Sequence, residues 1–178
     1  YNGHLGQNNI VSYSSPVQIP GTTWAKVPKN GVAQSFGIKT DGTLWAWGDN
    51  GFGALGLNSP NPSDVSSPTQ IPGTTWSSID GTTAGEGIFG VKTDGTAWGW
   101  GRNEYGQLGL NNRTYYSSPV QIPGTSWSKI YGALNGAYAL KTDNTIWAWG
   151  RGANGSLGLN QLDYNLSSPV QIGCDAGW

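Results

Sequence analysis

Short segments of the chain alternate apolar residues with small or polar ones, and this period of two predicts β-strands. The segments 36–39 and 44–47 both show the alternation, and Asp41-Gly42 lies between them. An Asp-Gly pair between two such segments favours a two-residue hairpin turn in which both residues have positive φ. The pair returns at Asp94-Gly95 and, as a variant, at Asp143-Asn144. The chain is therefore expected to form antiparallel hairpins.

Two further strands are expected before each hairpin. In the first copy they are the segments 17–19 and 23–27, and Pro20-Gly21 turns the chain between them. Trp24 and Val27 are three positions apart, so they cannot share one face of a regular strand. We interpret this spacing as a β-bulge.

All four segments belong to a repeat, which the spacing of Ser66 and Ser117 sets at 51 residues. A Ser-Ser-Pro segment that is followed by a Trp begins at Ser14, Ser66, Ser117 and Ser167. A block ending in Trp-x-Trp-Gly starts at Lys39, Lys92 and Lys141, and Gly-x-Leu-Gly starts at Gly3, Gly53, Gly106 and Gly155. We divide the single array 1–178 into a partial unit, 1–27, and the units 28–79, 80–130 and 131–178, the last incomplete at its C-terminus.

Four short antiparallel strands per repeat are typical of a β-propeller blade. We therefore expect an all-β protein with three complete four-stranded blades and one partial blade. A solenoid is the competing architecture. Helical repeats are excluded because a chain with 29 Gly shows no period of 3.6 residues. Three and a half blades cannot close a ring, so we expect the chain to be part of a larger one.

Tryptophan supplies most of the large apolar side chains, and each of the 10 Trp falls on a repeat position. In every Trp-x-Trp-Gly the two rings share a strand face and the residue between them is small. We expect the rings to fill the space between successive blades, where each buries a large area. The predicted structural core is Trp24, Trp45, Trp47, Trp76, Trp98, Trp100, Trp127, Trp147 and Trp149.

Composition argues against several functional classes. The net charge is -1 and no basic tract is present, so electrostatic binding of nucleic acid is not expected. No apolar run approaches 18 residues, so membrane insertion is not expected either. Cys174 and His4 are the only Cys and His in the chain, too few for a disulfide framework, a zinc site or a catalytic triad. We predict no catalytic residue, no metal and no cofactor.

The segment 94–101, with Asp-Gly and Trp-x-Trp-Gly, is followed by Gly-Gln-Leu-Gly at 106–109 and by Pro119 with Val120 and Ile122. This order of motifs resembles the repeat of the regulator of chromosome condensation family. The resemblance extends over essentially the whole chain. It implies a propeller, seven-bladed in the best-known members, in which the two ends of the chain complete one shared blade.

Departures from the family pattern narrow the function that the resemblance implies. Many family units carry a His five residues before the position of Lys39, where this chain has Gln34, Gly87 and Gly136. The founding member is a nucleotide-exchange factor for a small nuclear GTPase, and no segment matches its inserted wedge. The units look more like the bacterial and bacteriophage repeat proteins of the family, which favours an extracellular, cell-surface or virion location.

Three recurring residue types have alternative interpretations. The Trp pairs suit stacking on sugars, but their strict recurrence favours the interior between blades. Lys39, Lys92 and Lys141 form either a ring of cations for an anion or, as we favour, strand-end side chains that protect a sheet edge. The three aspartates of the hairpins are interpreted as turn residues rather than metal ligands. His4 is expected in a surface loop and Cys174 as an ordinary thiol.

The segments after Gly-x-Leu-Gly vary most between units and occupy the same slot in each blade, so we expect them on one rim. Tyr and Arg are enriched where proteins bind one another. The candidate partner-binding residues are Tyr13, Arg113, Tyr115, Tyr116 and Tyr164. The competing interpretation is that they belong to solvated connecting loops.

We therefore predict a non-enzymatic scaffold for protein–protein interaction, a structural or adhesive component of a bacterial surface or a phage virion. Its expected partners are a protein or the neighbouring subunits of an assembly. Lectin-like carbohydrate binding is one alternative function. A guanine-nucleotide-exchange or signalling scaffold is the other.

Overall fold

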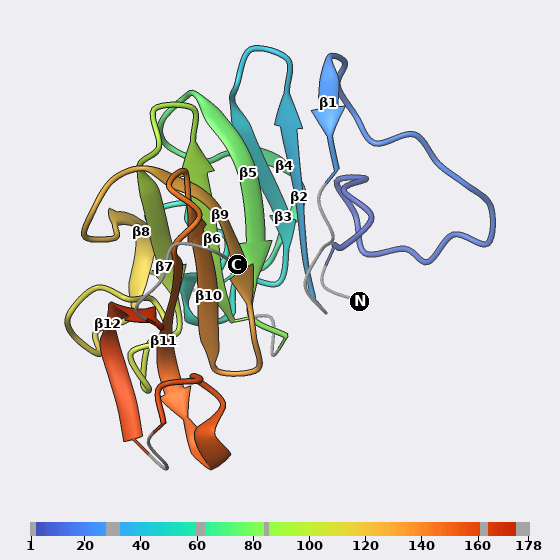
Figure 1. Cartoon of the computed structure of the whole chain (residues 1–178). Coiled ribbons are helices and arrows are strands. Elements are labelled where there is room, and N and C mark those ends of the chain that lie inside the picture. The colour runs from blue at the N-terminus through green and yellow to red at the C-terminus, as the bar shows by residue number, and fades with distance from the viewer. Residues whose placement is uncertain (1–2, 28–32, 60–62, 84–85, 161–163, 174–178) are drawn as a thin grey trace.

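Strands form nearly all of the regular structure (Figure 1). The computed structural model describes residues 3–27, 33–59, 63–83, 86–160 and 164–173. Short 3-10 turns, η1 (Gly51–Gly53) and η2 (Ala153–Gly155), follow the third strand of the first and the third sheet. The strands are β1 (Trp24–Lys26), β2 (Gln34–Lys39), β3 (Leu44–Gly48), β4 (Val65–Gln70), β5 (Trp76–Gly81), β6 (Gly87–Lys92), β7 (Ala97–Gly101), β8 (Tyr116–Gln121), β9 (Trp127–Gly132), β10 (Gly136–Lys141), β11 (Ile146–Gly152) and β12 (Tyr164–Ile172).

The strands form three antiparallel sheets of four strands each, as the repeat predicts. The first sheet has the order β1-β2-β3-β4, the second β5-β6-β7-β8 and the third β9-β10-β11-β12. In Figure 1 they are the blue to cyan, the green to yellow and the orange to red groups. Each sheet begins at the Trp after one Ser-Ser-Pro segment and ends with the next Ser-Ser-Pro segment. Consecutive strands are therefore neighbours in every sheet, as in a propeller blade. Of the two further strands, only the one that begins with Trp precedes the hairpin of its sheet, and the Ser-Ser-Pro strand follows it.

The strand predicted at 17–19 is wrong. This segment is exposed and belongs to no sheet, and it lies within the long blue loop of Figure 1. The equivalent segments form β4, β8 and β12, which pair with β3, β7 and β11. Within the described residues no strand precedes 17–19, so its backbone lacks the neighbour that makes the other copies strands.

The hairpin turns lie where they were predicted, but their type differs. Only the second turn residue has positive φ, 77° at Gly42 and 78° at Gly95, whereas the Asp before it has not. The Gly42 N–H donates to the Lys39 carbonyl at 3.0 Å, and the Lys39 N–H donates to the Thr43 carbonyl at 3.0 Å. This is the three-residue hairpin loop, in which a type I turn is followed by one left-handed residue. Asn144 occupies that position in the third sheet with φ of 65°.

The bulge predicted after Trp24 is confirmed. The pairing of β1 with β2 shifts register between Trp24 and Lys26, and that of β5 with β6 shifts between Trp76 and Ser78. The third sheet shows the same shift opposite Trp127. One extra residue turns the Trp side chain out of the regular alternation of the strand. The first Trp of each sheet can therefore face the Trp pair on the third strand.

The core lies between the sheets. One buried cluster joins Phe36 and Leu44 of the first sheet to Trp76 and Trp100 of the second. A second cluster joins the second sheet to the third, and its Trp149 is fully buried. The hydrophobic interior is therefore formed where the face of one sheet packs against the face of the next, as in stacked blades.

Each sheet is bonded to the Gly-x-Leu-Gly loop that precedes it in the array. The Trp100 indole N–H donates to the Ala54 carbonyl at 3.0 Å, and the Trp149 indole N–H donates to the Gln107 carbonyl at 2.9 Å. The Trp47 indole donates in the same way to the carbonyl of His4. Backbone N–H groups of the same loops donate across each joint, Asn8 to Ser66, Asn58 to Ser117 and Asn111 to Ser167. The Gly-x-Leu-Gly motif is thus the connector between successive sheets.

Candidate partner-binding rim

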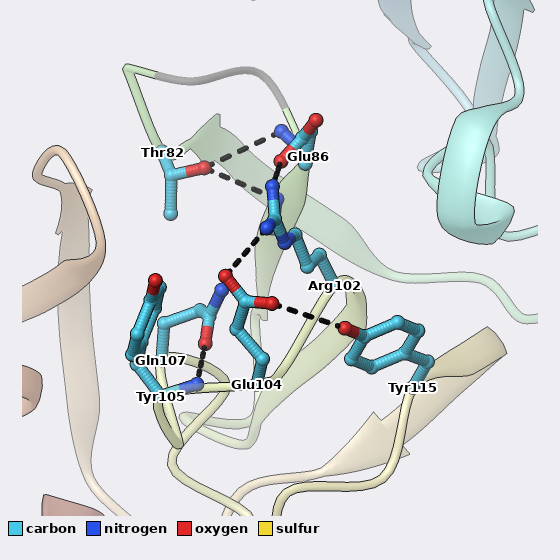
Figure 2. A network of polar contacts seen from close by, with 8 residues as sticks. Thr82, Glu86, Arg102, Glu104, Tyr105, Gln107 and Tyr115 are labelled. Carbon is cyan, nitrogen blue, oxygen red and sulfur yellow. Dashed lines mark hydrogen bonds and ion pairs between the residues drawn. The ribbon is translucent and has the colours of Figure 1, made fainter. Parts of the chain in front are cut away.

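A cluster of charged and aromatic side chains lies where loops of the first two sheets meet (Figure 2). Arg102 directly follows β7, and its backbone N–H donates to the Glu86 carbonyl at 2.7 Å. The buried hydroxyl of Thr82 accepts from the backbone N–H of Gly87 at 3.1 Å and of Glu86 at 3.4 Å. These contacts fix the backbone at the entrance of β6 against the exit of β7, and so position the two charged side chains.

Arg102 bridges two carboxylates. Its Nη1 forms an ion pair with Oε2 of Glu86, and its Nη2 forms one with Oε1 of Glu104. The hydrogen bond to Glu86 and the charges of both carboxylates raise the pKa of the Arg102 guanidinium, against a smaller effect of burial. The side chains of the three residues are 27%, 29% and 30% exposed. One cation and two anions leave this surface with a net charge of -1, and the guanidinium is held in a fixed orientation.

Two aromatic rings complete the cluster. Phe52, held at φ of 55° in η1, lies under the Arg102 guanidinium, whose Cζ is 5.0 Å from the ring centre. The Tyr115 ring meets Phe52 edge to face at 5.5 Å, and its hydroxyl donates to Glu104 at 3.4 Å. Both rings are 42% exposed. We call Phe52, Glu86, Arg102, Glu104 and Tyr115 the rim cluster.

The stacking of Arg on an aromatic ring recurs at the next joint. Arg151 follows Trp-x-Trp-Gly as Arg102 does, and its Cζ is 5.1 Å from the ring centre of Tyr105. Tyr105 holds the repeat position of Phe52. The Tyr105 backbone N–H donates to the buried Gln107 side chain at 2.9 Å. The second joint therefore repeats the cation–aromatic pair without the two carboxylates.

The four tyrosines and one arginine expected on the rim have different surroundings. Tyr115 belongs to the rim cluster, and Arg113 is exposed two residues before it. Tyr116 is half-buried, packs against both core clusters and accepts a hydrogen bond from Asn112 at 3.1 Å. Tyr13 is 43% exposed before the first sheet, and Tyr164 is half-buried at the start of β12 opposite Gly152. They therefore lie in the segment before the first sheet, at the second sheet and at the third.

Sequence reasoning missed four members of the rim cluster, although recurrence pointed to two of them. Arg102 and Arg151 both follow Trp-x-Trp-Gly, and Phe52 and Tyr105 both stand one residue before the Gly that opens Gly-x-Leu-Gly. Two side chains that recur together at a fixed spacing are candidates for contact between units. No such signal marks Glu86 and Glu104, which have no counterpart in the other units.

The recurring lysines and aspartates are engaged locally. The ammonium groups of Lys39, Lys92 and Lys141 lie over Trp rings, 3.9 to 5.1 Å from the ring centres. The hairpin aspartates each accept from the side chain and the backbone N–H of the Thr two residues later, at 2.7 to 3.0 Å.

Among the described residues no three His, Cys, Asp or Glu side chains gather to hold a metal. In that part of the chain no helix has the length and apolar character to cross a membrane. Cys174 lies outside the described residues.

Four-stranded antiparallel sheets that pack face to face through tryptophans, with their exposed contacts on connecting loops, define the class of β-propeller repeat proteins. The sequence profile described as "Regulator of chromosome condensation (RCC1) repeat" matches residues 41–85 and 94–133. The chain therefore carries repeats of the RCC1 family.

The family relatives are much longer than this chain. The Ultraviolet-B receptor UVR8 of Arabidopsis thaliana is 30% identical over 131 residues, which is 72% of this chain and 29% of the receptor. Protein RCC2 of Homo sapiens is 36% identical over 93 residues, which is 51% of this chain and 17% of that protein. The solved structure of Prp20p from Saccharomyces cerevisiae is similar with a TM-score of 0.81 at 17% identity, over 99% of this chain and 46% of Prp20p. At that identity the structural similarity shows the fold alone.

Proposed function

We propose that the protein is a non-enzymatic scaffold that binds a protein partner through the rim cluster. One observation carries the proposal: two aromatic rings, each 42% exposed, meet edge to face. Phe52 lies under an arginine that is bound by two carboxylates, and the Tyr115 hydroxyl donates to one of these carboxylates. Exposed aromatics that are already ordered lose little conformational entropy on binding, and Tyr and Arg are typical of binding hot spots. The family supports the proposal, since the reported work on Prp20p concerns its binding to Gsp1p and histones.

Charge favours a basic segment on the partner. The two carboxylates of the rim cluster outnumber its one guanidinium, so the cluster itself carries a net charge of -1 before its neighbour Arg113 is counted. A Lys or Arg of the partner can pair with Glu104 while its neighbours cover the rings. Arg113 is exposed beside the cluster and is proposed as a contact at its edge. Tyr13, in the segment before the first sheet, and Tyr164, at the third sheet, are proposed as separate contacts.

The finer form of the proposal is a structural or adhesive component of a bacterial surface or a phage virion. It rests on the resemblance of the repeat to bacterial and phage members of the family. Antibody labelling of intact cells or particles tests it, because a surface component is labelled without permeabilisation. An antigen that is reached only after permeabilisation or disruption contradicts the surface location and leaves the scaffold proposal standing.

The test of the rim cluster compares partners recovered by matched variants. The double variant Phe52→Ala with Tyr115→Ala removes both rings, and Tyr131→Ala removes a 53% exposed ring of the third sheet, outside the cluster. We expect proteins cross-linked to the wild type to be retained by Tyr131→Ala and reduced at least tenfold in the double variant. Equal recovery by both variants contradicts the proposed surface. Far-UV circular dichroism checks that both variants remain folded.

A further inference from the structure

The first tryptophan of each sheet has an indole N–H without a hydrogen-bond partner. Trp76 and Trp127 are 3% and 2% exposed, and their Nε1 atoms, like that of Trp24, are buried and unpaired. The other indoles of each sheet are paired, one with the Thr two residues before it and one with a loop carbonyl. Buried polar groups in native proteins normally have partners. The same indole nitrogen is unpaired in all three sheets, which points to one kind of hydrogen-bond acceptor that pairs with it in each sheet.

A lysine accompanies each unpaired indole. In the third sheet, Nζ of Lys141 is 4.7 Å from the Trp127 ring centre and 4.2 Å from that of Trp147. The ring faces attract the ammonium group but offer it no hydrogen-bond acceptor in the usual sense. Within the described part of the chain the ion pairs involve only Arg102 with its two glutamates. The nearby Asp143 carboxylate is bound to Thr145. The Lys141 ammonium therefore has no carboxylate ion-pair partner.

The indole N–H and the ammonium converge on one point. A Cβ atom placed on Gly124 would lie 3.6 Å from Nε1 of Trp127 and 3.7 Å from Nζ of Lys141. The second sheet repeats this geometry at Gly73, with 3.6 Å to the indole nitrogen and 3.2 Å to the ammonium. Glycine accommodates the positive φ of the turn, 95° at Gly124. Two donors, one of them charged, thus lie close together against this turn.

This point borders a cavity with room for more than an ion. In the third sheet the cavity has a volume of about 310 Å³, at the lower end of the range of small-ligand sites. The half-exposed Trp147 ring and Pro169 form flat apolar walls, whereas Asn111 and Ser168, which are hydrogen-bonded at 3.0 Å, form a polar one. A flat apolar wall beside a polar edge suits a sugar ring, whose C–H face stacks on indole while its hydroxyls pair with amides.

We propose that each sheet carries a binding site for a hexuronate residue of an acidic saccharide. The carboxylate accepts from the indole N–H of the first Trp and from the lysine ammonium, and the sugar ring lies on the second Trp. The sites comprise Trp24, Lys39 and Trp45 in the first sheet, Trp76, Lys92 and Trp98 in the second, and Trp127, Lys141 and Trp147 in the third. Each lysine is half-buried, lies over Trp rings and also interacts electrostatically with the hairpin Asp two residues later. These sites are separate from the rim cluster, and the proposal does not depend on the partner-binding function.

Indole N–H signals in a ¹H–¹⁵N NMR spectrum of the protein test the sites directly. The 10 Trp give one signal each, and Trp→Phe variants assign them. Methyl glucuronoside is expected to shift the signals of Trp24, Trp76 and Trp127 more than the other seven, in a saturable way. Methyl glucoside, which lacks the carboxylate, is expected to shift none of them at the same concentrations. Equal shifts with the two glycosides, or no shift with either, overturn the proposal.

One variant separates the sites from one another within a single molecule. In Lys141→Gln the response of Trp127 to methyl glucuronoside is expected to weaken at least tenfold, while that of Trp76 is unchanged and reports that the protein is folded. Lys129→Gln, at an exposed position of β9, removes the same charge outside the site and is expected to change neither response. A Trp127 response that survives Lys141→Gln overturns the carboxylate site. Acetate binding as tightly as methyl glucuronoside overturns the assignment to a saccharide.

Discussion

The two indoles of one Trp-x-Trp pair have different roles, and Trp100 and Trp98 illustrate the difference. Trp100 is fully buried at the joint and donates to the Ala54 carbonyl, whereas Trp98 is half-buried and donates to the Thr96 hydroxyl. We expect Trp100→Phe to lower the free energy of unfolding by about 2–4 kcal/mol, because it leaves a buried carbonyl unpaired and a void. Trp98→Phe is expected to lower it by about 1 kcal/mol or less. Urea unfolding measures both, and equal losses contradict the assigned roles.

A second residue-scale prediction concerns the hairpin carboxylates. Asp94 accepts from the Thr96 hydroxyl at 2.7 Å and from its backbone N–H at 2.9 Å, and these bonds lower the pKa of Asp94 below its ordinary value of 3.8. The folded state therefore binds its proton less readily than the unfolded state. The resulting stabilisation is complete above the unfolded pKa and is lost as the pH falls through the folded pKa.

Asp94→Asn isolates this effect because the amide keeps an acceptor oxygen and loses the charge. We expect the variant to be less stable than the wild type at neutral pH, and the difference to shrink as the pH falls below about 3.8. Urea unfolding of both proteins along a series of acidic buffers measures the difference. A difference that stays constant with pH contradicts the assignment.

At the scale of the element, the hairpin depends on one left-handed position. Gly95 has φ of 78°, and a Cβ there would lie 3.3 Å from the backbone of Ser126. We expect Gly95→Ala to destabilise the protein by about 1–2 kcal/mol, since an L-residue at this φ is strained. Gly95→Asn is expected to cost less, because Asn144 occupies the equivalent position with φ of 65° and Asn tolerates this region. Thermal unfolding ranks the two variants, and an Ala variant as stable as the Asn variant contradicts the argument.

The elements were predictable from local sequence where their partners were also local. Strands β2 and β3 follow from alternation and a turn pair only a few residues long, and the bulge follows from the spacing of Trp24 and Val27. The segment 17–19 carries the same residues as two of its three later copies, yet it is no strand, because a strand also needs a neighbour to bond with. The hairpin type was missed because Asp-Gly suits both a two-residue turn and the last two positions of a three-residue loop.

The rim cluster was missed because it joins Phe52, Glu86 and Arg102 across two sheets, and no pattern within one unit records such contacts.

At the scale of the whole molecule, stability depends on the joints between sheets. In the part of the chain that the structure describes, one core cluster and one clamping loop join successive sheets at each joint. In such arrays stability is approximately a sum of unit and interface contributions, so one joint can weaken while others persist. Gly106 allows a direct test, because a Cβ there would lie 2.6 Å from the Cα of Ser167 in β12. The clash is with backbone, which cannot yield as a flexible side chain can.

We therefore expect Gly106→Ala to open the joint between the second and third sheets selectively. Backbone amides of β10 and β11 should lose at least tenfold of their protection against hydrogen exchange, while those of β2 and β3 keep theirs, because local opening needs less free energy than global unfolding. Gly53→Ala, whose Cβ would lie 2.6 Å from the Cα of Ser117, is the matched variant at the joint between the first and second sheets. Hydrogen exchange followed by mass spectrometry resolves the sheets from one another. If both variants lose protection uniformly over all three sheets, the molecule unfolds as a single cooperative unit and its joints are not separable elements of stability.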